Sequence, residues 1–272
     1  MGSAMRIAVV IPVRDDGAAL ERCLAALQRQ LRTADELVVV DSGSMDDSAA
    51  IALRYGARLV HPEGAGIPAA TAAGLDAAHG DLLARLDADT VAPADWLARI
   101  EAAFVADPDL EAVSGAATYY GGSRLVRFLA RRSLTIGYFR LIAGVLGHAP
   151  LYGSNFAIRD NLWRRVRSSV HRARADVHDD VDLSLQLPPG TRVEYDPRLT
   201  VSVSARSFLR PGGTGRQISM TVRTLRVTNR ETNLLRLRLR WFLATARSGR
   251  RRRRDRRDAR ARRARAGRSA LT

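Results

Sequence analysis

Strand-like and helix-like segments alternate over the first ninety residues, and this alternation restricts the fold more than any other feature of the sequence. Short, mostly apolar runs at 5–12, 37–40 and 80–86 predict buried strands, and the first of them is rich in β-branched residues. Apolar residues at helical spacing predict helices over 18–31 and 69–78. Strands that alternate with helices favour an α/β fold with a mostly parallel central sheet flanked by helices.

Acidic turns follow three of the predicted strands. Asp15 follows the first strand, Asp41 closes the second, and Asp87 and Asp89 follow the third in the order D-A-D. Open α/β sheets bind ligands beside the carboxyl ends of their strands. Mg²⁺ and Mn²⁺ prefer oxygen ligands, and Mg²⁺ commonly joins one or two carboxylates to substrate phosphates. The D-x-D pair therefore indicates a Mg or Mn site for a diphosphate, and the alternative for so short a motif is a solvated turn.

Five segments, in order, resemble the motifs of family 2 glycosyltransferases, which have the GT-A (Rossmann-like) fold. They are I-P-V-R-D-D, V-V-V-D-S-G-S-M-D-D-S, R-L-D-A-D-T, G-S-N-F-A-I-R and H-D-D-V-D-L-S-L-Q-L. The resemblance extends over about residues 5–205. It implies an inverting, metal-dependent transferase that moves a sugar from a nucleotide-diphosphate sugar to an acceptor hydroxyl. Transfer of a single sugar is expected, because the Q-x-x-R-W motif of processive relatives is absent.

The resemblance also implies roles for individual residues. The residues implied to hold the nucleotide sugar are Pro12, Arg14, Asp15, Asp41 and Asp87. Asp89 is implied to bind the metal, and Asp180 to act as the general base. The residues implied to lie beside the sugar and the acceptor are Gly153, Ser154, Asn155 and Asp179.

The chemistry of sugar transfer explains why these residue types recur. A hydroxyl is a poor nucleophile at neutral pH, so a carboxylate within hydrogen-bond reach has to take its proton. We expect the charge of Asp179 to raise the pKa of Asp180. His178 stands where Thr is common, which leaves the hydrogen bonding of the base open. Local sequence alone also allows Asp179, Asp180 and Asp182 to be an acidic helix start, and Asn155 to stabilise a turn.

Composition divides the chain into three predicted parts. They are a GT-A domain at 1–215, made of a nucleotide-sugar half (1–120) and an acceptor half (121–215), a helical amphipathic extension at 216–247, and an arginine-rich tail at 248–272. The tail contributes much of the net charge of +16 and has almost no apolar residue, so it is expected to be disordered. Three loop arginines are either a clamp for the diphosphate or ordinary surface residues: Arg206, Arg210 and Arg216.

Two segments interleave arginine with leucine and aromatic residues. They lie at 124–146 and 234–243, and such a pattern suits the interface of a membrane that carries anionic lipid. We expect peripheral attachment to an anionic membrane at the inner face of the plasma membrane, supported by the tail, and a lipid-linked acceptor. The alternative is a helix packed on the domain with a solvated tail, and the sequence leaves both open.

A cytoplasmic protein is expected, because Cys23 is the sole cysteine and the start of the chain lacks a secretory signal.

Two other functional classes would each explain one feature of the sequence. A nucleic-acid-binding protein would use the arginine-rich tail on phosphates, but the acidic strand ends would then have no role, so nucleic acid is not expected as the main partner. A haloacid-dehalogenase-like phosphatase would use Asp87 as its nucleophile, but such enzymes need a lysine and this chain has none.

Overall fold

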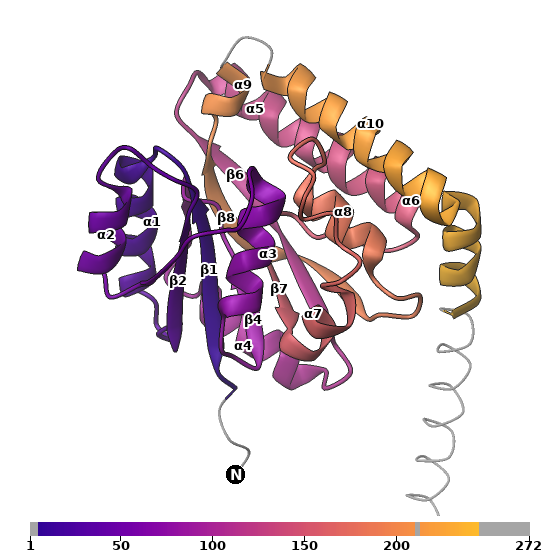
Figure 1. The fold of residues 1–272 in the computed structure, drawn as a ribbon, viewed down its shortest axis with the longest axis horizontal. Helices are drawn as coiled ribbons and strands as arrows, with labels where there is room; N and C mark the ends of the chain where they lie inside the picture. The colour runs from indigo at the N-terminus through magenta and orange to yellow at the C-terminus, as the bar shows by residue number, and fades with distance from the viewer. Residues whose placement is uncertain (1–4, 210–212, 245–272) are drawn as a thin grey trace, which may run out of the picture.

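The computed structural model describes residues 5–209 and 213–244, and its centre is an eight-stranded sheet (Figure 1). Across the sheet the strands follow the order β3-β2-β1-β4-β7-β6-β8-β5. In chain order they are β1 (Ile7–Val13), β2 (Glu36–Asp41), β3 (Arg58–Val60), β4 (Leu82–Arg85), β5 (Thr90–Val91), β6 (Ala112–Tyr120), β7 (Phe156–Arg159) and β8 (Val193–Ser204).

Helices cover both faces of this sheet (Figure 1). They are α1 (Gly17–Gln28), α2 (Ser48–Arg54), α3 (Ile67–Ala77), α4 (Trp96–Ala106), α5 (Arg124–Arg132), the π-helical η1 (Ser133–Ile142), α6 (Ala143–Leu146), α7 (Asp160–Val166), α8 (Asp179–Gln186), α9 (Arg206–Leu209) and α10 (Gly213–Thr232). Residues 234–244 form a further helix after α10. The predicted α/β fold with a helix-flanked central sheet is confirmed.

The sheet is parallel at one end and mixed at the other. Strands β3, β2, β1 and β4 run parallel, whereas β7 is antiparallel to both β4 and β6. Strand β8 then runs parallel to β6, and the short β5 is antiparallel to β8. The parallel end follows the predicted alternation of strands and helices. The mixed end places β7, a strand from the second half of the chain, directly beside the D-x-D strand β4.

Strand β1 is apolar along its length because helices cover it on both sides. Its residues from Ile7 to Ile11 are fully buried, and they alternate between two hydrophobic cores, one on each face of the sheet. Helix α3 approaches the sheet closely at Gly74, where a Cβ atom would lie 2.7 Å from Cγ2 of Val40 and would also overlap Val10. Glycine is therefore required at this position of α3.

A register shift interrupts the long pairing of β6 with β8. It falls between Gly115 and Ala116. The side-chain amide of the fully buried Asn155 forms hydrogen bonds with backbone groups on both strands there. The amide nitrogen of Asn155 donates to the carbonyl oxygens of Ala116 at 2.9 Å and Leu199 at 2.7 Å. Its oxygen accepts a 2.8 Å bond from Nε1 of Trp96. Asn155 thus satisfies backbone groups that the irregular ladder leaves unpaired.

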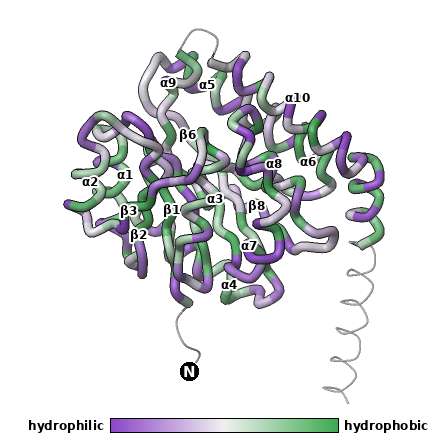
Figure 2. The backbone as a smooth tube through the Cα atoms, in the orientation of Figure 1, coloured by the Kyte–Doolittle hydropathy of each residue, from purple (hydrophilic) through white to green (hydrophobic). Residues whose placement is uncertain are grey.

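The long helix α10 runs across one side of the molecule and contacts α8 and α9 (Figure 1). After α10 the backbone turns at Asn233, whose φ is 55°. Trp241 in the following helix is buried, and its ring stacks on His148 at 4.1 Å between centroids. Polar and apolar residues alternate along α10 and this helix (Figure 2). No helix in the described ranges is long and apolar enough to cross a membrane.

The predicted extension at 216–247 corresponds, in its described part, to most of α10 and the helix at 234–244. The tail at 248–272 and residue Arg210 lie outside the described residues. The division of the chain into a domain, an extension and a tail therefore remains a prediction.

Candidate functional site

The turns that follow β1 and β2 bind one another at the carboxyl edge of the sheet. The backbone N–H of Asp15 donates to Oγ of Ser44 at 3.0 Å, and that hydroxyl donates to Oδ1 of Asp41 at 2.6 Å. In return, the N–H of Met45 donates to Oδ1 of Asp15 at 2.7 Å. Asp15 has a φ of 50°, in the left-handed region that aspartate tolerates better than most residues. Two of the predicted nucleotide residues, Asp15 and Asp41, are therefore brought together.

Two more of the five predicted nucleotide-sugar residues lie beside them. Pro12 belongs to β1 and is paired in register with Val40 of β2, one residue before Asp41. Arg14 extends into solvent, with 67% of its side chain exposed, and its Nε lies 3.8 Å from Oδ2 of Asp15. This leaves the Arg14 guanidinium accessible at the edge where the strands end.

The two carboxylates of the D-x-D motif differ in their environment. Both oxygens of Asp87 have partners, because Nη2 of Arg85 lies 2.9 Å from Oδ1 and the hydroxyl of Ser154 donates to Oδ2. Asp89 instead has Nη2 of Arg206 at 3.2 Å from its Oδ2. Burial and the nearby charges of Asp87 and Asp16 raise the pKa of Asp89 to about 6, although Arg206 opposes them. A cation close to Asp89 would therefore stabilise its ionised form.

The turn that carries Asp89 is fixed through its backbone. The carbonyl oxygen of Asp89 accepts a 2.9 Å bond from the hydroxyl of Tyr120 and a 3.3 Å bond from the N–H of Ser204. These partners are the last residues of β6 and β8. The position of the predicted metal ligand therefore depends on strands from the other end of the sheet.

A buried arginine joins the D-x-D motif to the predicted base. Arg85, the last residue of β4, is 2% exposed and contacts Asp87 at 2.9 Å and Asp179 at 3.1 Å. Its charge compensates two carboxylates that stand on different elements. Sequence reasoning missed this role, although a single arginine in an otherwise apolar strand, two residues before the motif, is a usable signal.

Helix α8 begins with the predicted base. Asp180 is 3% exposed, its Oδ2 accepts a 2.8 Å bond from the N–H of Gly153, and its Oδ1 lies 2.6 Å from Nδ1 of His178. Burial acts to raise the pKa of Asp180, but His178, the Gly153 N–H and Arg85 together lower it below its ordinary value. Asp180 is therefore ionised at neutral pH.

The expectation that Asp179 raises the pKa of Asp180 was wrong, because each carboxylate has its own cation. It is the pKa of Asp179 that is raised, by burial and by the charge of Asp180, against the opposing effect of Arg85.

The partner of the predicted base, which the sequence left open, is the imidazole of His178. Burial disfavours its charged form, but Asp180 and Asp179 raise the pKa of His178 to about 9.

The segment before β7 contributes two of its three predicted residues to this site. Gly153 holds Asp180 through its N–H, and a Cβ atom here would lie 3.1 Å from Oδ2 of Asp180 and would overlap Arg85. Ser154 is 3% exposed and holds Asp87. Asn155 does not face the site, because its amide is buried in the β6–β8 irregularity.

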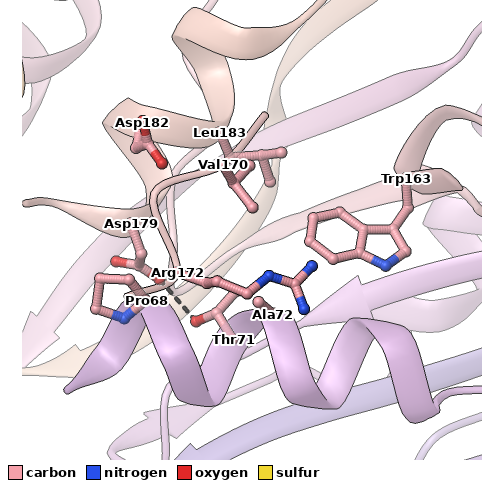
Figure 3. A pocket seen from close by; sticks show the side chains of 9 residues that line it. All are labelled: Pro68, Thr71, Ala72, Trp163, Val170, Arg172, Asp179, Asp182 and Leu183. Atoms are coloured by element: carbon pink, nitrogen blue, oxygen red, sulfur yellow. Dashed lines mark hydrogen bonds between the residues drawn. The ribbon is translucent and has the colours of Figure 1, made fainter. Parts of the chain in front are cut away.

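A small pocket lies between α3 and α8, on the other side of Asp179 (Figure 3). Its lining residues are Pro68, Thr71, Ala72, Trp163, Val170, Arg172, Asp179, Asp182 and Leu183. The hydroxyl of Thr71 donates to Oδ2 of Asp179 at 2.8 Å across it. The pocket includes neither carboxylate of the D-x-D motif, so we place the chemistry at the strand ends and not here.

Two groups of side chains come into question as metal ligands. Within the described residues, His178, Asp179 and Asp180 are a group whose ligand atoms lie within 4.8 Å of one another. Arg85 already compensates Asp179, and His178 already pairs with Asp180. The negative charge of both carboxylates is therefore balanced without a metal. Asp89 fits a hard cation better, because burial and the charges of Asp87 and Asp16 raise its pKa and it shares a single arginine with Asp16.

Comparison with known proteins agrees with this geometry. The family described as glycosyl transferase family 2 matches residues 8–166. A TPR repeat-containing protein of Synechococcus elongatus is 42% identical over 91 residues, which is 33% of this chain and 22% of that protein. The uncharacterized glycosyltransferase YibD of Escherichia coli is 34% identical over 94 residues, 33% of this chain and 27% of YibD. The matched region thus spans about a quarter of the length of these relatives.

A solved structure shares the fold. Glucosyl-3-phosphoglycerate synthase from Mycobacterium tuberculosis, in complex with Mn²⁺, UDP and glucosyl-3-phosphoglycerate, superposes with a TM-score of 0.51 at 22% identity. The superposition covers 74% of this chain and 70% of the synthase. The fold, the order of the motifs and the family match agree, and the chain belongs to glycosyltransferase family 2.

Proposed function

We propose that this protein is an inverting, metal-dependent glycosyltransferase that moves one sugar from a nucleotide-diphosphate sugar to an acceptor hydroxyl. The observation that carries the proposal is the continuous network between the D-x-D motif and the start of α8. In it, Arg85 joins Asp87 to Asp179, while Ser154 and Gly153, which are consecutive, hold Asp87 and Asp180. The proposed metal-binding motif and the proposed base, Asp180, therefore border the same region of the molecule.

We assign the divalent cation, Mg²⁺ or Mn²⁺, to Asp89. When bound, such a cation neutralises charge that develops on the departing diphosphate. The structure of the Mycobacterium tuberculosis neighbour in complex with Mn²⁺ and UDP supports the choice of a divalent cation. Asp87, which is held by Arg85 and Ser154, would accept hydrogen bonds from the nucleotide sugar beside the cation. Pro12, Arg14, Asp15 and Asp41 would hold the nucleoside at the adjoining strand ends.

We assign the general base to Asp180. Its carboxylate is ionised at neutral pH, and the Gly153 N–H and His178 fix its orientation. A carboxylate in that position takes the proton of the acceptor hydroxyl as the oxygen attacks the anomeric carbon. The diphosphate departs on the opposite side of the sugar, so the configuration at that carbon inverts. Gly153, Ser154 and Asp179 would line the sugar and acceptor side.

The test of this function is a screen of nucleotide diphosphates and their sugars. We expect binding of UDP or GDP that requires Mn²⁺ or Mg²⁺ and is lost with a chelator, followed by hydrolysis or transfer from the matching sugar nucleotide. Binding of nucleotides without any metal dependence would contradict the proposal. Salt-sensitive binding to DNA of any sequence, without nucleotide binding, would instead support the nucleic-acid alternative.

We further propose that the protein works at an anionic membrane surface, on the cytoplasmic side, and that its acceptor is lipid-linked. Helix α5 exposes Leu125, Phe128 and Leu129 on one face between arginines. The helix at 234–244 does the same, and its exposed apolar residues are Leu235, Leu239, Phe242 and Leu243. Apolar faces flanked by arginine favour insertion among anionic headgroups.

Co-sedimentation with vesicles of anionic or neutral lipid tests this surface. We expect binding to anionic vesicles only, and about a tenfold loss in the double variant L239S/F242S. Leu53→Ser is the matched control, since Leu53 is 61% exposed on α2 at the other side of the molecule (Figure 1). Equal binding of L239S/F242S and the control would remove the helix from the membrane proposal. Unchanged binding after deletion of 248–272 would remove the tail.

A further inference from the structure

Arg206, which follows the last long strand, contacts two acidic turns, the one after β1 and the one that carries Asp89. It follows β8 as the first residue of α9. Its Nη1 donates to Oδ1 of Asp16 at 2.8 Å and its Nη2 donates to Oδ2 of the same carboxylate, so this pair is bidentate. The same Nη2 lies 3.2 Å from Oδ2 of Asp89. Arg206 therefore spans the turn after β1 and the D-x-D motif.

This arginine stands where the proposed metal needs to be. A divalent cation bound to Asp89 has to approach its carboxylate to about 2.0–2.2 Å. In the described part of the chain, Arg206 is the cation that contacts Asp89, whereas Asp87 is compensated by the buried Arg85. A guanidinium 3.2 Å from the same oxygen repels an incoming cation.

The bidentate pair with Asp16 gives Arg206 a second anchor. Because both of its outer nitrogens donate to Asp16, Arg206 can release Asp89 and still be held near the site. A diphosphate that arrives with the metal offers oxygen acceptors that suit the planar guanidinium. With 39% of its side chain exposed, Arg206 has room to turn toward such a ligand.

We propose that Arg206 is an internal, displaceable counter-ion of Asp89. In the free protein it neutralises Asp89 and disfavours binding of the metal alone; when the metal arrives with a nucleoside diphosphate, its guanidinium moves from Asp89 to the diphosphate. The metal and the nucleotide therefore bind as a pair. This inference rests on the proposed function, and it assigns to Arg206 a positioning role at the donor site.

The proposal predicts opposite effects of one substitution on two ligands. In Arg206→Gln, Mn²⁺ without nucleotide binds about tenfold more tightly, because a competing positive charge is gone. In the same variant, UDP or GDP binds about tenfold more weakly at saturating Mn²⁺, because a charged phosphate contact is lost. A residue with a purely structural role would change both affinities in the same direction.

The experiment measures free Mn²⁺ by electron paramagnetic resonance and nucleotide binding by calorimetry, on the full chain. Arg198→Gln is the matched control, because Arg198 lies in β8, the strand that precedes Arg206, and pairs with Asp196 at the surface. Arg206→Lys keeps the charge and should bind Mn²⁺ as the wild type does. If Arg206→Gln folds poorly, Arg206→Met removes the same charge and takes its place in both measurements.

Two results would overturn the inference. One is an Arg206→Gln variant that binds Mn²⁺ no more tightly than Arg198→Gln, and the other is an Arg206→Lys variant that binds it as tightly as Arg206→Gln. In both cases wild-type binding of Mn²⁺ with UDP or GDP would leave the proposed function intact. If the wild type binds neither UDP nor GDP in the presence of Mn²⁺, the proposed function itself fails.

Discussion

The guanidinium of Arg85 lies 3.1 Å from the carboxylate of Asp179, so the strand that leads into the D-x-D motif and the helix that carries the predicted base share one buried charge. The same guanidinium contacts Asp87 at 2.9 Å. Removing this cation would leave two carboxylates uncompensated in the interior, which is far more costly than removing an exposed ion pair.

We therefore expect Arg85→Met to lower the free energy of unfolding by about 3–5 kcal/mol. Urea denaturation followed by circular dichroism measures this change. Arg99→Gln is the control, since Arg99 pairs with Asp95 at the surface and its loss should cost about 0.5 kcal/mol. Equal effects of the two substitutions would show that Arg85 does not hold the site together.

Asp89→Asn should stabilise the protein while it removes metal-dependent nucleotide binding. The folded state raises the pKa of Asp89 to about 6 from an ordinary value near 4, so this residue favours unfolding increasingly as pH rises from about 4 to about 6. Above about pH 6 the variant lacks this penalty, and we expect a gain of about 1–3 kcal/mol.

Thermal unfolding of Asp89→Asn and the wild type between about pH 4 and 8 measures this difference, and a Mn²⁺ titration follows the binding. The gain should shrink toward about pH 4. An Asp89→Asn variant that is less stable than the wild type at neutral pH, or that still binds Mn²⁺ with UDP or GDP, would show that Asp89 is not the destabilising metal ligand proposed.

Asp180→Asn should lower kcat by about 10²–10⁴, because the amide cannot accept the proton of the acceptor hydroxyl. The amide oxygen can still accept the bond from the Gly153 N–H, so the fold and the donor site should persist. Single-turnover transfer assays together with Mn²⁺-dependent UDP or GDP binding separate the two effects. Normal turnover in this variant would exclude Asp180 as the base.

His178 stabilises the folded protein, and this contribution to stability is lost at alkaline pH. Its folded pKa of about 9 lies above its ordinary value near 6.5, so its contribution is complete below about pH 6.5 and is lost as pH rises through about 9. Asp180, whose pKa is lowered, stays ionised across this range. We expect the Tm of the wild type to fall by several degrees between about pH 6.5 and 9.5.

His178→Gln should flatten this part of the profile, because glutamine has no proton to lose. Scanning calorimetry of the two proteins in the same buffers measures the difference, and groups common to both cancel. A variant that loses as much Tm as the wild type over the same alkaline range would assign the transition to other groups.

Local sequence was sufficient for the parallel end of the fold. An apolar run and the acidic residues after it mark each of the strands β1, β2 and β4. These signals lie close together in the sequence, so a local pattern was enough to locate the strands. Strand β7 could not be foreseen as the antiparallel neighbour of β4, since the pairing of Leu82 with Arg159 joins residues far apart in the chain. The choice of a strand's partner depends on long-range packing, which no local pattern encodes.

The candidate site shows the same limit. The D-x-D motif and Asp180 were visible because each lies in a short, recognisable segment. Arg206 and Asp16 contact each other across 190 positions, and only the three-dimensional arrangement connects them. The pKa of Asp180 was misjudged for a related reason, because adjacency to Asp179 was known whereas Arg85 and the His178 contact were not.

Strand β5 follows Asp89 directly, and its partner in the sheet is β8, with Thr90 opposite Val203. More than a hundred residues separate the two strands along the chain. During translation, the ribosome has to synthesise all the residues up to β8 before the turn at Asp89 can adopt its folded conformation. A nascent chain halted in between carries the acidic motif without β8 beside it, so the proposed cation site can form only after β8 has been synthesised.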